Sequence, residues 1–397
     1  MLRYASTSVV LICVAVYYGR TDVSAASNNN QIPKRFLFLT EALRNYTIEV
    51  LYHTIVEQPE GQNVVMSPFI VLSTLAVLYE GKNENATLGF KEIYDWLKVD
   101  SSAGEINKIN SIFVNNQTLD LAALRDAAWK FYEVSVASFD FKDDRISSDI
   151  LNAITANLTH GRISSVVERS YFENASIVHA SAVRFKGQWT VPFNKTYTSK
   201  EPFYDNNGNK IGDVNMMFHR YTFPFANIKS LQARVLEIPY GNDKGLSMLI
   251  MLPYPRITLQ NMIRNFASVA VSTFFDILKS SQEEYADDEV DCYIPRFNIE
   301  STIDLKAALK RMGVYSLFDK NEANLPLLSL TPVYVSTAIQ KAEIEVTEDG
   351  IAETEVGFSH QIGAVRFQAN RPFFYMILEK VTNTIILGGV YVKPSLY

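Results

Sequence analysis

The chain has 397 residues, of which 47% are hydrophobic and 20% are charged. This balance is typical of a globular protein and excludes an intrinsically disordered one. The net charge of -6, with no long basic run, gives no attraction to nucleic acid or to acidic membranes, so neither is expected as a partner. No linker rich in Pro, Gly or Ser divides the chain, and we therefore expect one large domain.

The amino terminus has the pattern of a secretory signal peptide. Arg3 precedes an apolar stretch from Val9 to Tyr18, and small residues follow up to Ala26. A basic start, a short apolar core and a small-residue cleavage site predict that residues 1–26 are removed. A buried first helix is the alternative interpretation, and the apolar core is too short to cross a bilayer. We expect residues 27–397 to form a secreted, extracellular and soluble protein.

The glycan acceptor sites agree with secretion, and the cysteine count predicts a fold without an intrachain disulfide. Glycan acceptors of the form Asn-x-Ser/Thr are predicted at Asn45, Asn85, Asn116, Asn157, Asn174 and Asn194. Cys13 leaves with the signal peptide, so Cys292 remains without a partner for an intrachain disulfide. Cys292 lies in the alternating run Val290–Ile294, which favours a buried structural thiol over a reactive one.

The hydrophobic periodicity changes along the chain. The first half predicts mainly helices, at Leu37–Glu57, Ser67–Gly81, Leu119–Tyr132 and Ser147–Leu158. The second half predicts short strands, at Ala180–Phe185, Ala233–Ile238, Leu246–Leu252, Val290–Phe297, Phe373–Leu378 and Thr384–Val392. Between these strands, Thr302–Met312 predicts a helix that ends at Gly313. The pattern indicates an α+β fold with helices early and strands late.

No common catalytic or nucleotide-binding motif is present in the sequence. The patterns Gly-x-Ser-x-Gly, His-Glu-x-x-His, Cys-x-x-Cys and the P-loop are all missing. None of the five histidines has a second ligand at helical metal spacing: His53, His160, His179, His219 and His360. We therefore predict no catalytic residues, no metal and no cofactor, and a protein that is not an enzyme. The missing motifs make an enzyme less expected but do not exclude one, because catalytic triads assemble from residues that are far apart in the sequence.

Six blocks of the sequence, taken in order, resemble the serpin superfamily, in particular its extracellular, insect-like members. The blocks are Asn63–Pro68, Ala182–Trp189 with Phe193, Val235–Tyr240 with Leu246–Pro253, Ile294–Phe297 with Asp304–Leu305 and Met312–Val314, Lys341–Gly350, and Asn370–Phe373. The chain departs from the family pattern at Ile70, Ile154 and Ser181, where Ser, Trp and Asn are usual. These three positions lie where the main sheet of the family opens.

The resemblance implies the serpin fold, with three β-sheets, about nine helices and an exposed reactive centre loop near residues 350–367. In inhibitory members a serine protease attacks the loop and forms an acyl-enzyme. The cut loop then inserts as a new strand into the main sheet and carries the protease with it. By the same resemblance, the expected partner is an extracellular serine protease and the protein is expected to be a monomer.

The hinge of this loop is unusual for an inhibitor. The predicted hinge residues are Glu348, Asp349, Gly350, Ile351, Ala352, Glu353, Thr354 and Glu355. Alternate residues of an inserted strand face the interior, and the resemblance places inside Ile351, Glu353, Glu355 and Gly357. Burying unpaired carboxylates costs several kcal/mol, so this register opposes insertion. A register shifted by one residue would place inside Ala352, Thr354, Val356 and Phe358.

The length of the loop argues the same way, and the bond that a protease would cleave stays open. By comparison with inhibitory members, the segment from Gly350 to Phe367 is shorter by about five residues, which removes about 17 Å of reach. Counting forward from the hinge places the scissile bond near Ala364, and counting back from the next strand places it near Phe358. Arg366 would suit a trypsin-like enzyme, but the next strand usually starts there.

Three classes of function follow from these observations. The favoured class is a secreted serpin that does not trap proteases and is at most a weak substrate for them. The second class is a working inhibitor of serine-type endopeptidases that acts by loop insertion. The third class is a carrier of a small apolar ligand.

Overall fold

The computed structural model describes most of the chain. The described residues are 34–80, 101–115, 121–142, 144–243, 245–268, 271–284, 289–325, 328–329, 331–351 and 365–397. Several predicted features lie outside them: the signal peptide 1–26, the glycan acceptors Asn85 and Asn116, and residues 352–364 of the loop.

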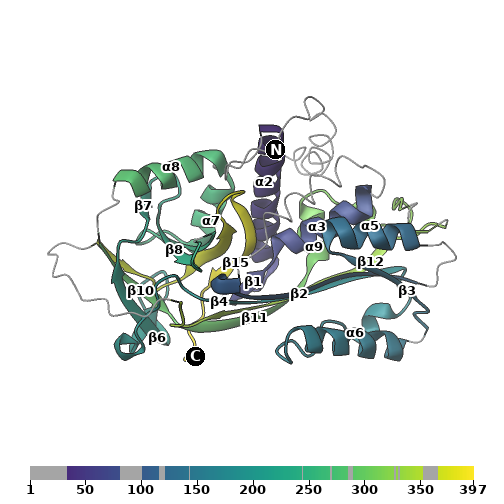
Figure 1. Ribbon diagram of the computed structural model, residues 1–397, viewed down its shortest axis with the longest axis horizontal. Helices are drawn as coiled ribbons and strands as arrows, with labels where there is room; N and C mark the ends of the chain where they lie inside the picture. The colour runs from purple at the N-terminus through teal and green to yellow at the C-terminus, as the bar shows by residue number, and fades with distance from the viewer. Residues whose placement is uncertain are drawn as a thin grey trace.

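A sheet of five strands, which we call the main sheet, runs along the long axis of the molecule (Figure 1). In spatial order its strands are β11 (Phe297–Asp304), β12 (Val335–Val346), β4 (Ile177–Gly187), β2 (Gly104–Asn115) and β3 (Ser135–Phe139). The two strands β4 and β12 are parallel neighbours, with Glu343 opposite Arg184 and Glu345 opposite Lys186. On their other sides, β12 pairs antiparallel with β11, and β4 pairs antiparallel with β2.

Two further sheets complete the β-structure of the described residues. The six-stranded sheet has the order β1 (Val64–Met66), β15 (Thr384–Tyr391), β14 (Phe373–Glu379), β9 (Leu246–Pro253), β8 (Ala233–Tyr240) and β7 (Phe225–Ile228). The four-stranded sheet has the order β13 (Val365–Gln368), β10 (Val290–Pro295), β6 (Lys210–Tyr221) and β5 (Ser199–Tyr204). The three sheets and their mixture with helices match the α+β serpin fold that the resemblance implies.

The described residues also contain seven α-helices. They are α2 (Lys34–Glu57), α3 (Pro68–Glu80), α5 (Ala122–Tyr132), α6 (Asp144–Leu158), α7 (Leu259–Ser268), α8 (Val271–Glu284) and α9 (Leu305–Arg311). Short 3-10 turns lie at Ser101–Ala103, Arg169–Phe172, Lys195–Tyr197 and Ser316–Phe318. Figure 1 shows α6 on one face of the main sheet and α3, α5 and α9 on the other. None of the helices in the described ranges is long and apolar enough to cross a membrane.

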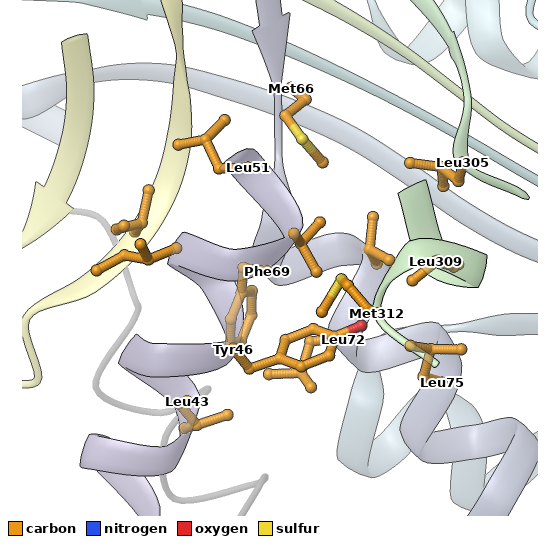
Figure 2. Close-up of a cluster of buried hydrophobic side chains, with 14 of the residues drawn as sticks. Leu43, Tyr46, Leu51, Met66, Phe69, Leu72, Leu75, Leu305, Leu309 and Met312 are labelled. Atoms are coloured by element: carbon orange, nitrogen blue, oxygen red, sulfur yellow. The ribbon is translucent and has the colours of Figure 1, made fainter. Parts of the chain in front are cut away.

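Beneath the main sheet, α2, α3 and α9 pack together within the largest hydrophobic core cluster of the described residues. Most residues of α3 are apolar, and every residue from Phe69 to Leu78 is buried, including Ser73 and Thr74. Figure 2 shows Tyr46 of α2 beside Phe69 and Leu72 of α3, with Leu309 of α9 completing the cluster. The helix α3 begins as predicted after Ser67, whose hydroxyl accepts a hydrogen bond from the amide of Ile70 at 3.4 Å. This cluster holds α3 under the centre of the main sheet.

Two sequence predictions about the fold are wrong in part. The four helices predicted in the first half are confirmed as α2, α3, α5 and α6, but the first half also supplies β2 and β3 of the main sheet, which the sequence did not predict. The predicted helix Thr302–Met312 starts only at Leu305, since residues 302–304 continue β11 and pair with β12. Asp304 then caps the helix by accepting a hydrogen bond from the amide of Lys306 at 2.9 Å. The predicted helix-end glycine, Gly313, is confirmed by its φ of +89°.

Candidate functional site

The candidate site is the boundary between β4 and β12, which we call the seam, with residues 348–351 that follow β12. A chain that turns back after residue 350 runs antiparallel to β12. Since β4 is parallel to β12, such a strand could pair antiparallel with both, but only after they separate. In the structure β12 pairs directly with β4 from Val335 to Glu345, with no strand between them. The seam is therefore closed.

Under the seam, an amide side chain ties β12 to the start of α3. Gln340 accepts a hydrogen bond from the Ser67 amide at 2.6 Å and donates one to the Ser67 carbonyl at 3.0 Å. It also lies 3.5 Å from the hydroxyl of Ser181 on β4. The Ser67 hydroxyl donates to the carbonyl of Ile386 on β15 at 2.7 Å. Strands from two sheets and one helix therefore meet at this buried point.

His179 of β4 lies in the same layer and is a structural residue. Its Nε2 lies 2.9 Å from the hydroxyl of Thr74 and 3.0 Å from the side-chain oxygen of Asn110. Burial lowers the pKa of His179 to about 3, so the ring is neutral near pH 7. Among the described residues, no group of three His, Cys, Asp or Glu side chains is placed to hold a metal ion.

On the opposite face of the seam lies a row of charged side chains, which we call the belt: Glu105 of β2, Arg184 of β4, and Glu343 and Glu345 of β12. The Arg184 guanidinium lies 2.8 Å from Glu345, 3.6 Å from Glu343 and 3.3 Å from Glu105. Asn298 of β11 donates a hydrogen bond to Glu343 at 3.1 Å. Arg184, Glu343 and Glu345 are at most 5% exposed, so their ion pairs are buried.

Neighbouring side chains stabilise the ionised form of Glu345. Burial by itself would raise the pKa of Glu345. Hydrogen bonds from Lys186 and from the Tyr397 hydroxyl, with the charges of Lys186 and Arg184, outweigh burial and hold that pKa below its usual value. Glu345 is therefore ionised at neutral pH.

The described hinge residues continue the closed seam beyond β12. The Trp189 amide donates to the Asp349 carbonyl at 3.1 Å, and the Ile351 amide donates to the Trp189 carbonyl at 3.0 Å. Glu348 is buried, accepts a hydrogen bond from Thr198 at 2.7 Å and lies 3.5 Å from Arg296. The hinge is thus paired with the chain after β4 as far as the described residues extend.

Trp189 explains why a glycine occupies position 350. The indole is buried, stacks on Tyr240 with ring centroids 4.2 Å apart and donates to the Thr347 carbonyl at 2.7 Å. A Cβ atom at position 350 would lie 2.6 Å from the Trp189 carbonyl oxygen and 2.8 Å from Pro192. Only a glycine lets the hinge approach the Trp189 backbone this closely.

Comparison with known proteins decides the family. The family model described as serpin (serine protease inhibitor) matches residues 41–394. The chain belongs to the serpin family. A curated relative, serpin B3 of Homo sapiens, is 30% identical over 327 residues, which cover 80% of this chain and 82% of that protein.

Solved serpin structures share the fold. Serpin-12 of Manduca sexta, which is named a serine protease inhibitor, matches with a TM-score of 0.75 and 22% identity, over 89% of this chain and 100% of that one. Serpin48, described as highly specific, from the insect Tenebrio molitor, matches with a TM-score of 0.73 and 21% identity, over 92% of this chain and 100% of that one. At these identities the likeness concerns the fold alone.

The predicted site residues fall into two groups. The structure places Glu348, Asp349, Gly350 and Ile351 together at the end of the seam, whereas Ala352, Glu353, Thr354, Glu355, Phe358 and Ala364 lie outside the described residues. Arg366 lies in β13, where its backbone is the register partner of Asp291 in the parallel strand β10. The central carbon of its guanidinium lies 4.8 Å from the centre of the Tyr293 ring. The place of Arg366 in β13 agrees with the expectation that the next strand of the serpin fold begins there.

The three departures from the serpin pattern have different surroundings. Ile70 and Ser181 are buried beside the Gln340 cluster, while Ile154 on α6 is 45% exposed. The predicted structural thiol is confirmed, because Cys292 is fully buried in β10 and burial raises its pKa. Four of the six predicted glycan acceptors are described, and all four are exposed: Asn45, Asn157, Asn174 and Asn194.

Proposed function

We propose that this chain is a secreted, glycosylated serpin that an extracellular serine protease can cleave but that does not trap the protease. The observation that carries the proposal is the closed, charged seam, which is followed in the chain by a loop with Glu353 and Glu355. Trapping requires the cut loop to enter this seam faster than the acyl-enzyme hydrolyses. Each added 1.4 kcal/mol of barrier slows insertion about tenfold.

Insertion in the register that the family uses would bury the loop carboxylates. The inner face of the seam is apolar, with Val183 and Phe185 on β4 and Ala342 and Ile344 on β12. A carboxylate that enters such a face has lost its water and finds no cation, which costs several kcal/mol. Glu353 and Glu355 would both enter this face, so each of them would add its own desolvation cost to insertion in this register.

The shifted register is opposed by the belt. In that register Glu353 and Glu355 would face the belt instead of the apolar layer. The belt already places the carboxylates of Glu343 and Glu345 beside Arg184 and Lys186, which pair with them. Two further carboxylates would make this face strongly anionic, and like charges at short distance repel. Neither register therefore accepts the loop at low cost, and the loss of about 17 Å of reach adds to both penalties.

Incubation with a panel of serine proteases, analysed on a denaturing gel, tests this proposal. We expect cleavage between Phe358 and Arg366 with release of free, active protease. Inactive protease that carries an active-site serine replacement serves as the control for non-specific association. A band at the summed mass of the two proteins that survives boiling would instead show a working inhibitor, the second function class.

Secretion and glycosylation are supported by the signal pattern of residues 1–26 and by the exposure of the four described acceptor sites. Expressed in a secretory cell, the protein is expected in the medium, and enzymatic removal of N-glycans should increase its mobility on a gel. Replacing Asn45, Asn157, Asn174 and Asn194 with Gln should reduce that change. Protein that stays in the cytosol without glycans would contradict this part of the proposal.

A further inference from the structure

We infer that the belt is a latch: the ion pairs of Arg184 with Glu343 and Glu345 set the rate at which β4 and β12 separate. The inference rests on the proposed function in taking strand insertion at the seam as the event that is restrained. It adds a second restraint on strand insertion, which lies in the main sheet and does not depend on the sequence of the loop. Arg184 is thereby a positioning residue for the closed sheet.

The geometry of the sheet requires these pairs to break on insertion. Neighbouring strands lie about 4.8 Å apart, so a strand placed between β4 and β12 would move them to about 9.6 Å. Arg184 and Glu345, now 2.8 Å apart, stand on opposite sides of the seam and could not stay paired. Because both side chains are buried, their separation would take from Arg184 its two buried carboxylates and leave it only Glu105, whose side chain is exposed.

The belt is attached to structure on both sides of the seam. On the β4 side, Arg184 also pairs with Glu105 of β2 at 3.3 Å. On the β12 side, Glu343 accepts a hydrogen bond from Asn298 of β11 at 3.1 Å. The row of contacts therefore crosses four of the five strands of the main sheet. When the seam opens, the contacts of Arg184 with Glu343 and Glu345 would break.

Tyr397 strengthens the latch from outside the main sheet. Its hydroxyl donates a hydrogen bond to Glu345. Its main-chain oxygen accepts hydrogen bonds from the side chains of Arg296 at 2.5 Å and Asn215 of β6 at 2.9 Å. Glu345 is thus bound to a segment that is itself attached to the four-stranded sheet, which restrains β12 further.

The test measures how fast the intact, full-length protein takes up a strand supplied from solution. The probe is a fluorescent synthetic peptide with the sequence of residues 351–364 in which both glutamates are replaced by alanine, so that loop carboxylates do not limit uptake. Uptake at pH 7 is followed by native gel and by fluorescence anisotropy. The test variant is Arg184→Met/Glu343→Leu/Glu345→Leu, which replaces the charges by apolar side chains of similar size.

The matched control removes an ion pair that joins two strands away from the seam. Arg220 of β6 and Asp291 of β10 are direct cross-strand neighbours with contacts of 2.5 and 2.9 Å, so the control variant is Arg220→Met/Asp291→Leu. A second test variant, Tyr397→Phe, removes one hydroxyl and keeps the aromatic ring, so it provides a readout even if the triple variant does not fold.

We expect the triple variant to take up the peptide at least tenfold faster than wild type, Tyr397→Phe to be a few-fold faster, and the control to match wild type. Uptake at the wild-type rate by the folded test variants, or equal acceleration in the control, would overturn the latch. Either failure is distinguishable from failure of the proposed function, which would appear as a boiling-resistant protease complex of the wild-type protein.

Discussion

Replacing Arg184 alone with methionine is expected to lower the free energy of unfolding by about 3–5 kcal/mol, because Glu343 is then buried without its cation. Glu345 keeps Lys186 at 3.2 Å, so most of the loss arises at Glu343 and at the packing around the removed guanidinium. The measurement is urea denaturation at pH 7, with an unchanged dependence on urea as the sign that the native state is otherwise intact.

Two control variants make this result specific. The side chain of Lys195 is 72% exposed in its ion pair with Asp349. Replacing Lys195 with methionine should therefore lower the free energy of unfolding by at most about 1 kcal/mol. The triple variant Arg184→Met/Glu343→Leu/Glu345→Leu should be as stable as wild type or more stable, since apolar side chains can replace a buried ion cluster without loss. A loss below about 1 kcal/mol for Arg184→Met would show that water reaches the belt.

The contribution of Glu345 to the stability of the fold should weaken in acid. The pKa of Glu345 is lowered in the folded state, so its contribution to stability is present above its usual pKa and is lost as the pH falls through the lowered value. The groups that face it are Lys186 and Arg184 on β4, Glu343 on its own strand, and Tyr397. The difference in the free energy of unfolding between wild type and Glu345→Gln should therefore be full near pH 7 and should shrink below the usual carboxyl range.

Much of the fold could be predicted because its signals are local. The Ser67-Pro68 start of α3, the apolar strands of the six-stranded sheet and Gly313 each depend on neighbours in the sequence. The strand β2 was missed because its first half alternates polar residues such as Glu105 and Lys108 with apolar ones only weakly. Its place in the sheet comes from pairing with β4 and β3, which no local pattern reports.

The belt could not be predicted from the sequence for the same reason. Arg184 and Glu345 are 161 positions apart, and they meet only because β4 and β12 pair in one register. Glu343 and Glu345, two residues apart on a strand, resemble the solvated face of a sheet. Gln340 offers a weak signal, as a polar residue within the buried run around Ala338 and Ile339. The hinge from Glu348 to Ile351 stays a prediction of the family resemblance, and the structure adds its contacts with Trp189.

Cleavage of the loop should change the stability of the wild-type protein very little at pH 7. In inhibitory serpins the cut loop becomes a full central strand, which adds ladder hydrogen bonds and buried apolar area. Here the inserted strand would bring in Glu353 and Glu355 and would part the Arg184 latch. A carboxyl that is buried by insertion has a raised pKa, so its penalty falls as the pH falls. The latch also weakens in acid, and both effects make insertion easier there.

Calorimetry of cleaved and intact protein measures strand insertion directly. For wild type at pH 7 we predict nearly equal melting temperatures, with a difference that grows as the pH is lowered toward the carboxyl range. Glu353→Ala/Glu355→Ala should restore a large rise on cleavage at pH 7, and adding the triple belt variant should make that rise appear sooner after cleavage. If cleaved wild type instead melts tens of degrees above intact protein at pH 7, the loop inserts freely, and neither the carboxylates nor the belt restrains this serpin.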